Sequence, residues 1–141
     1  MLVDANLLLY AIDRTSRRHG DALEWWESAL NGTERVGLPW QTIGAFLRIS
    51  THPRINDRPL RGDEAWGHVR DWLDVPTVWI PPAGAATARV FGDLVAAQAI
   101  TGNLVPDAML AALAIEHGLE LHSADTDFAR FPTLRWRNPL S

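Results

Sequence analysis

The feature that most limits the fold of this sequence is the alternation of short apolar segments with longer stretches of helical periodicity. The short apolar segments, which are typical of buried strands, lie at residues 2–3, 36–38, 78–80, 119–122 and 134–136. The stretches of helical periodicity lie at residues 17–30, 40–50, 63–73, 85–99 and 106–117. Strands that alternate with helices predict βαβ units, and so a mainly parallel central sheet flanked by helices on both faces. We therefore expect a three-layer α/β domain.

Length and composition favour one folded, soluble domain over residues 1–141, because domains are typically about 100–200 residues long. Hydrophobic residues make up 47% of the chain and charged residues 21%, which is ordinary for a folded protein. No apolar run approaches the roughly 18 residues that a membrane span needs, and the first residues lack the pattern of a secretory signal. We expect a cytoplasmic protein.

The chemistry of the chain is limited by the residues that it lacks. It has no cysteine, which excludes disulfides, thiolate metal sites and a cysteine nucleophile. Its net charge is −4, and all of its basic residues are arginine. This balance argues against a non-specific nucleic-acid coat, because such binding depends on neutralising phosphates. It leaves room for an enzyme that acts on nucleic acid through bound metal ions, with the acidity concentrated in the site.

Four aspartates lie where the elements of such a sheet place functional groups. Asp4 ends the first strand, Asp107 follows Pro106 in the first turn of a helix, and Asp125 and Asp127 follow the strand at residues 119–122. Ligands of parallel α/β sheets collect beyond the carboxyl ends of the strands. Carboxylates that converge there repel one another unless a cation neutralises them, and oxygen ligands select Mg²⁺ or Mn²⁺. Such an ion polarises phosphates and lowers the pKa of bound water.

Each aspartate also has a purely structural interpretation. Asp4 could cap a helix, Asp107 could complement a helix dipole, and Asp125 and Asp127 could be turn residues that bond to the local backbone. Together, their positions after two strands and at one helix start favour a metal site.

Three short motifs, in order, resemble the acidic motifs of PIN-domain nucleases: VDANLLLY at residues 3–10, LVPDA at 104–108 and SADTDF at 123–128. Residues 134–140 are similar to the closing strand of that family. The length, the motif order and the early position of the first aspartate resemble the VapC toxins of bacterial VapBC toxin–antitoxin modules. The resemblance spans essentially the whole chain.

The resemblance implies a PIN-like fold and an endoribonuclease that depends on Mg²⁺ or Mn²⁺. It implies cleavage of cellular RNA, often tRNA or rRNA, which slows translation, and products with 5′-phosphate and 3′-hydroxyl ends. It also implies a cognate VapB-type antitoxin, and a homodimer or a hetero-oligomer with that antitoxin.

The family's site residues carry over by position. Asp4, Asp107 and Asp125 match the first, third and fourth metal-binding acids, so the resemblance implies that they are catalytic and hold the metal. Asp127 matches a further acid that many members have, and Ser123 falls where the family carries a small polar residue beside the site.

One position departs from the family pattern. Ala45, in IGAFLR at residues 43–48, stands where the family has its second acid, a glutamate. Either the site works with fewer ligands and more water, or another acid replaces the glutamate, or activity is reduced. Glu24, Glu27 and Glu116 are the nearest helical candidates, and a solvated helix face is the alternative interpretation for each.

Two other functions compete with the nuclease. An Asp4 nucleophile would suit a phosphohydrolase, but that class normally needs a second acid where Asn6 stands, and a lysine. For a nuclease, Asn6 could bind a water or orient Asp4. The other competitor is a catalytically weakened PIN-fold binding module, because the second acid is missing at Ala45; it would act through protein or RNA binding.

Arginines gather after the helix at residues 40–50. Arg48, Arg54, Arg58 and Arg61 could, with His52, form a track for RNA phosphates. The alternative is a solvated loop.

The adjacent tryptophans Trp25 and Trp26 point about 100° apart on a helix, so they cannot share one narrow apolar face. We expect at least one at an edge or groove, where it would contact the antitoxin or a second copy of the chain. Stacking on RNA bases is a further option. The alternative is a wide helix face buried in the core.

Overall fold

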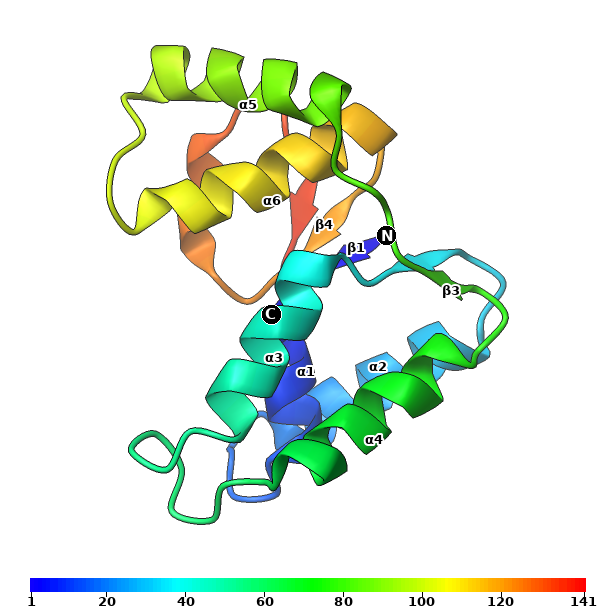
Figure 1. Ribbon diagram of the computed structural model, residues 1–141. Helices are drawn as coiled ribbons and strands as arrows, with labels where there is room; N and C mark the ends of the chain where they lie inside the picture. The colour runs from blue at the N-terminus through cyan, green and yellow to red at the C-terminus, as the bar shows by residue number, and fades with distance from the viewer.

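The computed structural model describes all 141 residues and confirms the three-layer α/β architecture. A five-stranded sheet has the order β3-β2-β1-β4-β5, with every neighbouring pair parallel (Figure 1). The strands are β1 (Leu2–Val3), β2 (Val36–Gly37), β3 (Val78–Trp79), β4 (Leu121–His122) and β5 (Trp136–Arg137). The helices are α1 (Ala5–Ile12), α2 (His19–Asn31), α3 (Trp40–Ser50), α4 (Gly62–Leu73), α5 (Ala85–Gln98), α6 (Leu104–His117) and the 3₁₀-helix η1 (Thr126–Arg130).

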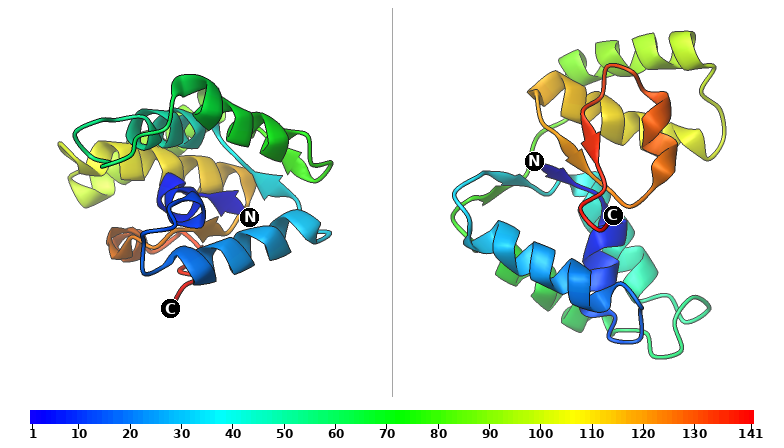
Figure 2. Two further views of the ribbon diagram at one scale, coloured as in Figure 1. Left: turned by 90° about the horizontal axis from the view of Figure 1, so that it is seen from below. Right: turned by 180° about the vertical axis from the view of Figure 1, so that it is seen from behind.

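The sheet separates two hydrophobic cores. Because successive side chains of a strand point to opposite faces, Leu2 packs with α5 and α6, whereas Val3 packs with α1 to α4. Figures 1 and 2 show the same division, with α5 and α6 on one side of the strands and α1 to α4 on the other. Both faces of the sheet are therefore covered, as expected for parallel strands.

The register of the central strands aligns the ends that matter for function. Leu2 lies opposite Leu121, and Val3 lies opposite His122, so β1 and β4 end side by side. On the other side of β1, Gly37 lies opposite Leu2. A Cβ at Gly37 would lie 2.9 Å from Cγ of Pro81, which is too close, so Pro81 can pack against β2 here only because residue 37 is glycine. Because Val3 and His122 are paired at the ends of β1 and β4, the residues that follow these two strands lie next to each other.

The helix α1 is the main element that sequence periodicity did not predict. The helix has only 8 residues, which is shorter than the stretch of about 11 or more over which a helical period can be recognised. The helix forms because Asp4 caps its first turn and because both of its flanks are covered, by α2 and by α3. The predicted helix at residues 40–50 is confirmed, and the other predicted helices differ from the structure by one or two residues at their ends.

The C-terminal segment differs from expectation in two details. A 3₁₀-helix, η1, forms where a loop was expected, and the last strand is formed by Trp136 and Arg137 rather than by residues 134–136. This register lets Nε1 of Trp136 donate a hydrogen bond to the carbonyl of Ser123 at 3.0 Å. The last strand thereby holds the backbone just beyond β4.

The structure corrects the interpretation of Trp26 as a partner contact. Its side chain is 2% exposed and packs edge-on against Trp72, with ring centroids 5.5 Å apart. Trp72 packs in turn against Phe46. Trp26 therefore belongs to the core between α2, α3 and α4, whereas Trp25 is half-buried and lines a cavity. Every helix of the structure is too short or too polar to span a membrane.

Candidate active site

Asp4 is both a helix cap and a member of a polar network. Its Oδ1 accepts a hydrogen bond from the backbone N–H of Ala5 at 2.8 Å, which caps α1. Its Oδ2 accepts hydrogen bonds from Oγ of Ser123 at 2.7 Å and from Nδ2 of Asn6 at 3.3 Å. Asp4 therefore caps α1 and belongs to the polar network at the same time, because its two carboxylate oxygens have different partners.

Ser123 joins the ends of β1 and β4. It is fully buried, and its Oγ accepts hydrogen bonds from Nδ2 of Asn6 at 3.1 Å and from the backbone N–H of Asp125 at 3.0 Å. Oδ1 of Asn6 accepts from the backbone N–H of Ala124 at 3.3 Å. This network fixes the side chain of Asp4 and the backbone of Asp125 relative to each other.

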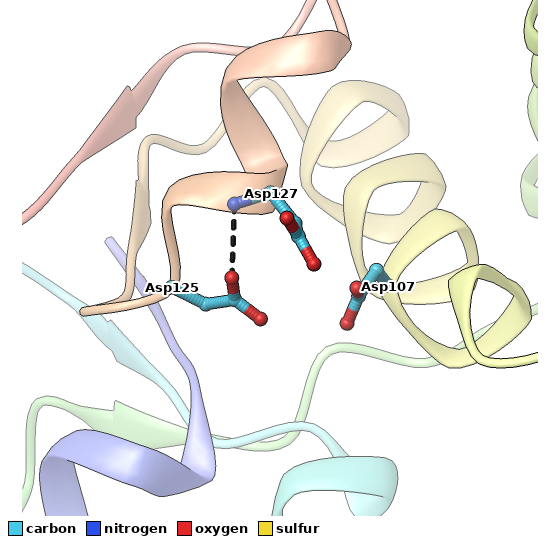
Figure 3. Close-up of side chains that lie close together, drawn as sticks. All are labelled: Asp107, Asp125 and Asp127. Atoms are coloured by element: carbon cyan, nitrogen blue, oxygen red, sulfur yellow. Dashed lines mark hydrogen bonds between the residues drawn. The ribbon is translucent and has the colours of Figure 1, made fainter.

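Three carboxylates converge beyond these strand ends. Asp107, from the first turn of α6, and Asp125 and Asp127, from the start of η1, each offer an oxygen within 4.8 Å of the other two (Figure 3). Asp125 also caps η1 by accepting a hydrogen bond from the backbone N–H of Asp127 at 2.9 Å. Asp4 lies outside this group of three. We call Asp107, Asp125 and Asp127 the acidic cluster.

The acids influence one another's ionisation. Burial, the largest cause, and the negative charges of Asp125, Asp4 and Asp127 together raise the pKa of Asp107 to about 6, against the opposing effect of Arg130. Burial is also the largest cause of a raised pKa at Asp4, where the charge of Asp125 adds to the effect and the hydrogen bond from Ser123 opposes it. Like charges held this close disfavour ionisation unless a cation compensates them.

The donor set fits a hard divalent cation. All of its side-chain ligand atoms are carboxylate oxygens, which Mg²⁺ and Mn²⁺ prefer. Bound positive charge would also relieve the repulsion that raises the pKa of Asp107. Both observations point to the same chemical class of ligand.

No glutamate replaces the acid that is missing at Ala45. Ala45 is half-buried on α3 and packs against the core. Glu24 and Glu27 are exposed on α2, and Glu116 lies at the far end of α6, where it accepts a hydrogen bond from Oγ1 of Thr87 at 2.6 Å. None of the three glutamates belongs to the acidic cluster.

The structure brings two further residues close to the acidic cluster. Nε2 of Gln41, one helical turn before Ala45, donates a hydrogen bond to the carbonyl of Pro106 at 2.8 Å and so ties α3 to the start of α6. Arg130, at the end of η1, is close enough for its charge to lower the pKa of Asp107. Gln41 lies four residues before Ala45, and Arg130 lies three residues after Asp127. Residues at these spacings are neighbours on one side of a helix, so the sequence alone could have indicated that both lie near the site.

The predicted arginine track lies at the opposite end of α3 from Gln41. Arg48 is in the last turn of α3, and Arg54 and Arg58 lie in the loop before α4 (Figure 1). All three are exposed, and so is Arg61, which forms an ion pair with Asp63 at 3.0 Å. The structure thus keeps these arginines on the surface and apart from the acidic cluster.

Comparison with known proteins identifies the family. The PIN domain family model matches residues 1–134. Ribonuclease VapC37 of Mycobacterium tuberculosis is 40% identical over 138 residues, which cover 98% of this chain and 96% of that protein. The chain belongs to the VapC family of PIN-domain proteins. Ribonuclease VapC33 of the same species is 39% identical and covers 99% of this chain and 98% of its own.

Solved structures show the same PIN fold. VapC20 of Mycobacterium tuberculosis, described as a toxin that cleaves the sarcin-ricin loop, superimposes with a TM-score of 0.69 at 20% identity, covering 97% of this chain and 98% of its own. VapBC2 from Rickettsia felis, bound to a DNA fragment from its promoter, gives a TM-score of 0.66 at 19% identity over 97% and 96% of the two chains. At these identities the likeness concerns the fold.

Proposed function

We propose that this protein is the toxin of a type II toxin–antitoxin module, a metal-dependent endoribonuclease that hydrolyses RNA phosphodiesters and inhibits translation. The observation that carries the proposal is the acidic cluster, with the raised pKa of Asp107, at the strand ends of a PIN domain. The names of the relatives support it, because VapC37 and VapC33 are both called ribonucleases. We propose tRNA or rRNA as the target.

The metal site is proposed to consist of Asp4, Asp107, Asp125 and Asp127. When bound there, Mg²⁺ or Mn²⁺ supplies positive charge for the phosphate and lowers the pKa of water. Asp107, Asp125 and Asp127 offer oxygens that face one another, and Asp4 adds negative charge beside them. The lone pairs of Asp4 that its three hydrogen bonds leave free remain for a ligand water.

Three neighbouring side chains support this chemistry. Ser123 favours the ionised form of Asp4 by donating to its carboxylate, and Asn6 holds both of them in place. Arg130 supplies a cation beside the acids, where it would contact a phosphate of the substrate. We expect cleavage to leave 5′-phosphate and 3′-hydroxyl ends, and products that carry a 2′,3′-cyclic phosphate would contradict this route.

We propose a VapB-type antitoxin as the partner that silences the toxin in the cytoplasm. The structural neighbours support this, because several are toxin–antitoxin complexes, such as VapBC2 from Rickettsia felis and a complex from Klebsiella pneumoniae. Trp25 is the member of the tryptophan pair that remains accessible to a partner.

For the homodimer we propose the apolar groove between α3, α5 and α6. The groove has a volume of about 420 Å³, and Trp40, Ile80 and Met109 line it while being 65%, 42% and 47% exposed. Exposed side chains of this size gathered on one face are typical of interaction surfaces. Met109→Glu should lower the mass measured by sedimentation to that of a monomer, whereas the same change at exposed Ala96 should not.

The missing acid at Ala45 favours one alternative function. Because no glutamate belongs to the acidic cluster, the alternative is a catalytically weakened domain that acts by binding RNA or protein. Protein synthesis in cells that express the chain from an inducible promoter separates the two functions. We expect the wild-type chain to arrest incorporation of labelled amino acids within minutes, and the variant Asp125→Asn, expressed at the same level, to leave it unchanged. Equal arrest by both proteins would favour the binding module.

A further inference from the structure

A cavity of about 330 Å³ lies at the C-terminal ends of α1 and α3, against the loop that precedes α4. Its volume falls within the range of about 300–1,000 Å³ that is typical of small-ligand sites. None of the four aspartates of the proposed metal site lines it, and no function described above uses it.

The two helices connect this cavity to the proposed metal site. Asp4 caps the first turn of α1, and Gln41, in the first turn of α3, contacts Pro106 next to Asp107. Both helices therefore begin at the site and end at the cavity, and Figure 1 shows α3 running from beside α6 to the loop before α4. At a rise of 1.5 Å per residue, the 8 residues of α1 and the 11 residues of α3 separate the two places by about 12–16 Å. A single strand of RNA covers this distance with about four stacked nucleotides, and with fewer when it is extended.

A positive patch surrounds the cavity. Residues 48–61 contain four arginines and one acid, in a chain whose net charge is −4. Three of these arginines are exposed and form no ion pair: Arg48, Arg54 and Arg58. Arg58 lines the cavity itself. Asp13, the one acid in the lining, accepts hydrogen bonds from the backbone N–H and the hydroxyl group of Thr15. The surroundings of the cavity therefore attract phosphate groups.

The wall of the cavity combines apolar surface with accessible polar atoms. The side chain of Ile55 lines it and is 56% exposed. Nδ2 of Asn56 donates to the carbonyls of Ile49 at 2.6 Å and His52 at 3.2 Å, which holds the amide group in the wall. Oδ1 of Asn56 accepts no hydrogen bond and is accessible, and so is the hydroxyl group of Tyr10. A ligand with apolar faces and a polar edge would use both kinds of surface.

We propose that this cavity binds one unpaired nucleobase of the RNA, and the choice of RNA as ligand rests on the proposed function. A base has two apolar faces, which suit Ile55, and an edge of donors and acceptors, which suits Asn56 and Tyr10. Proteins that read RNA sequence commonly take up such unstacked bases from single-stranded segments. The phosphates next to the base would contact the three free arginines. An apolar side chain of a protein partner would instead leave the polar atoms of the wall unpaired.

A base held in this cavity would determine where the RNA is cut. The cavity lies at a fixed distance from the proposed metal site because α1 and α3 join them. A strand whose base occupies the cavity would therefore present a phosphodiester a fixed number of nucleotides away to the acidic cluster. The cavity would act as a specificity-determining site, without contacting the reacting atoms.

The test measures RNA binding by the full-length protein in EDTA, so that no RNA is cleaved. The probes are fluorescein-labelled oligoadenylate, oligocytidylate and oligouridylate of equal length, and an abasic strand that keeps every ribose and phosphate but has no bases. Anisotropy gives the affinities. We expect the wild-type chain to bind at least one of the three RNAs about 10-fold more tightly than the abasic strand, the scale of one base packed on a protein side chain.

Three variants locate the binding. Ile55→Gln should remove most of the preference for bases and leave the affinity for the abasic strand unchanged. Arg58→Gln should weaken the RNA and the abasic strand equally, because it would contact phosphate. Trp66→Gln is the matched control, since Trp66 is also apolar and 41% exposed but lies outside the cavity lining, and it should keep the preference.

Four results would overturn the proposal. They are a wild-type chain that binds the abasic strand as tightly as the three RNAs, a preference that survives Ile55→Gln, equal losses in Ile55→Gln and Trp66→Gln, or an acidic peptide in place of a base. In the last case acetyl-Glu-Leu-Glu-amide would bind, Ile55→Gln would weaken it, and bases would add nothing. Because binding is measured without cleavage, a chain that prefers bases but cuts no RNA would contradict the nuclease and support the cavity. A chain that cuts RNA without this preference would do the reverse.

Discussion

The hydroxyl group of Ser123 donates a hydrogen bond of 2.7 Å to Oδ2 of Asp4, although the two lie 119 positions apart in the sequence. The contact exists because β1 and β4 are paired and end side by side. It lowers the pKa of Asp4, against the larger effect of burial, which raises it. Ser123, which follows β4, thus partly offsets the effect of burial on Asp4, which follows β1.

Removing this hydrogen bond should shift the pH dependence of cleavage. In Ser123→Ala the pKa of Asp4 rises further, so a smaller fraction of Asp4 is ionised at any given acidic pH. The acidic limb of the activity profile should therefore move to higher pH. The measurement is the initial rate of RNA cleavage between pH 5 and pH 8, and an unshifted limb would contradict the role of Ser123.

Thr42→Val is the matched control for Ser123→Ala. Oγ1 of Thr42 is buried and donates to the carbonyl of Val3 at 2.7 Å, so it also holds the end of β1, but it does not contact a carboxylate. Each variant should lose about 1 kcal/mol of the free energy of unfolding. Only Ser123→Ala should shift the pH profile.

The ionisation of Asp107 should destabilise the metal-free protein. Its pKa of about 6 in the folded state lies above the ordinary value of 3.8, so stability falls as pH rises from about 4 through about 6. In EDTA, Asp107→Asn should raise Tm by about 2 °C or more at pH 7, and the gain should vanish near pH 4. Asp93→Asn, an exposed change on α5, should show no such pattern. A gain that persists at pH 4 would rule out charge repulsion as its cause.

The two adjacent tryptophans should respond differently to truncation. Trp26→Ala leaves a cavity beside Trp72 and should cost about 3–5 kcal/mol of the free energy of unfolding. Trp25→Ala should cost less, about 1–2 kcal/mol, because its side chain is half-buried. Denaturant unfolding measures both values. Equal losses would contradict the placement of Trp26 in the core and Trp25 at its edge.

The arginines of the loop before α4 should contribute to RNA binding through phosphate contacts. Arg54 and Arg58 are exposed and form no ion pair, whereas Arg61 is paired with Asp63. Arg54→Gln with Arg58→Gln should reduce the slope of log affinity against log salt by about 1.4, because each phosphate contact on single-stranded RNA contributes about 0.7. Arg89→Gln on α5 is the control, and filter binding in EDTA prevents cleavage. An unchanged slope would show that the loop is only solvated.

The sequence predicted the architecture better than it predicted the surroundings of the site. Strand and helix periodicity was sufficient for the α/β class and for α3, because its apolar positions repeat along one face. It failed for α1, whose 8 residues are too few to show a helical period. Periodicity also could not show which side chains lie near Ala45. The contact of Gln41 with Pro106, for example, depends on how α3 packs against α6. Long-range packing decides such contacts, and local sequence does not record it.

Cleavage of RNA by the purified protein, freed of any antitoxin, tests the central claim most directly. The wild-type chain, Asp4→Asn and the surface control Glu27→Gln are each incubated with RNA in Mg²⁺, Mn²⁺ or EDTA. We predict cleavage by the wild-type chain and by Glu27→Gln with either metal, none in EDTA, and a rate at least about 100-fold lower in Asp4→Asn. Cleavage that survives EDTA or Asp4→Asn, or a folded wild-type chain that cuts no RNA with any metal, would contradict the account.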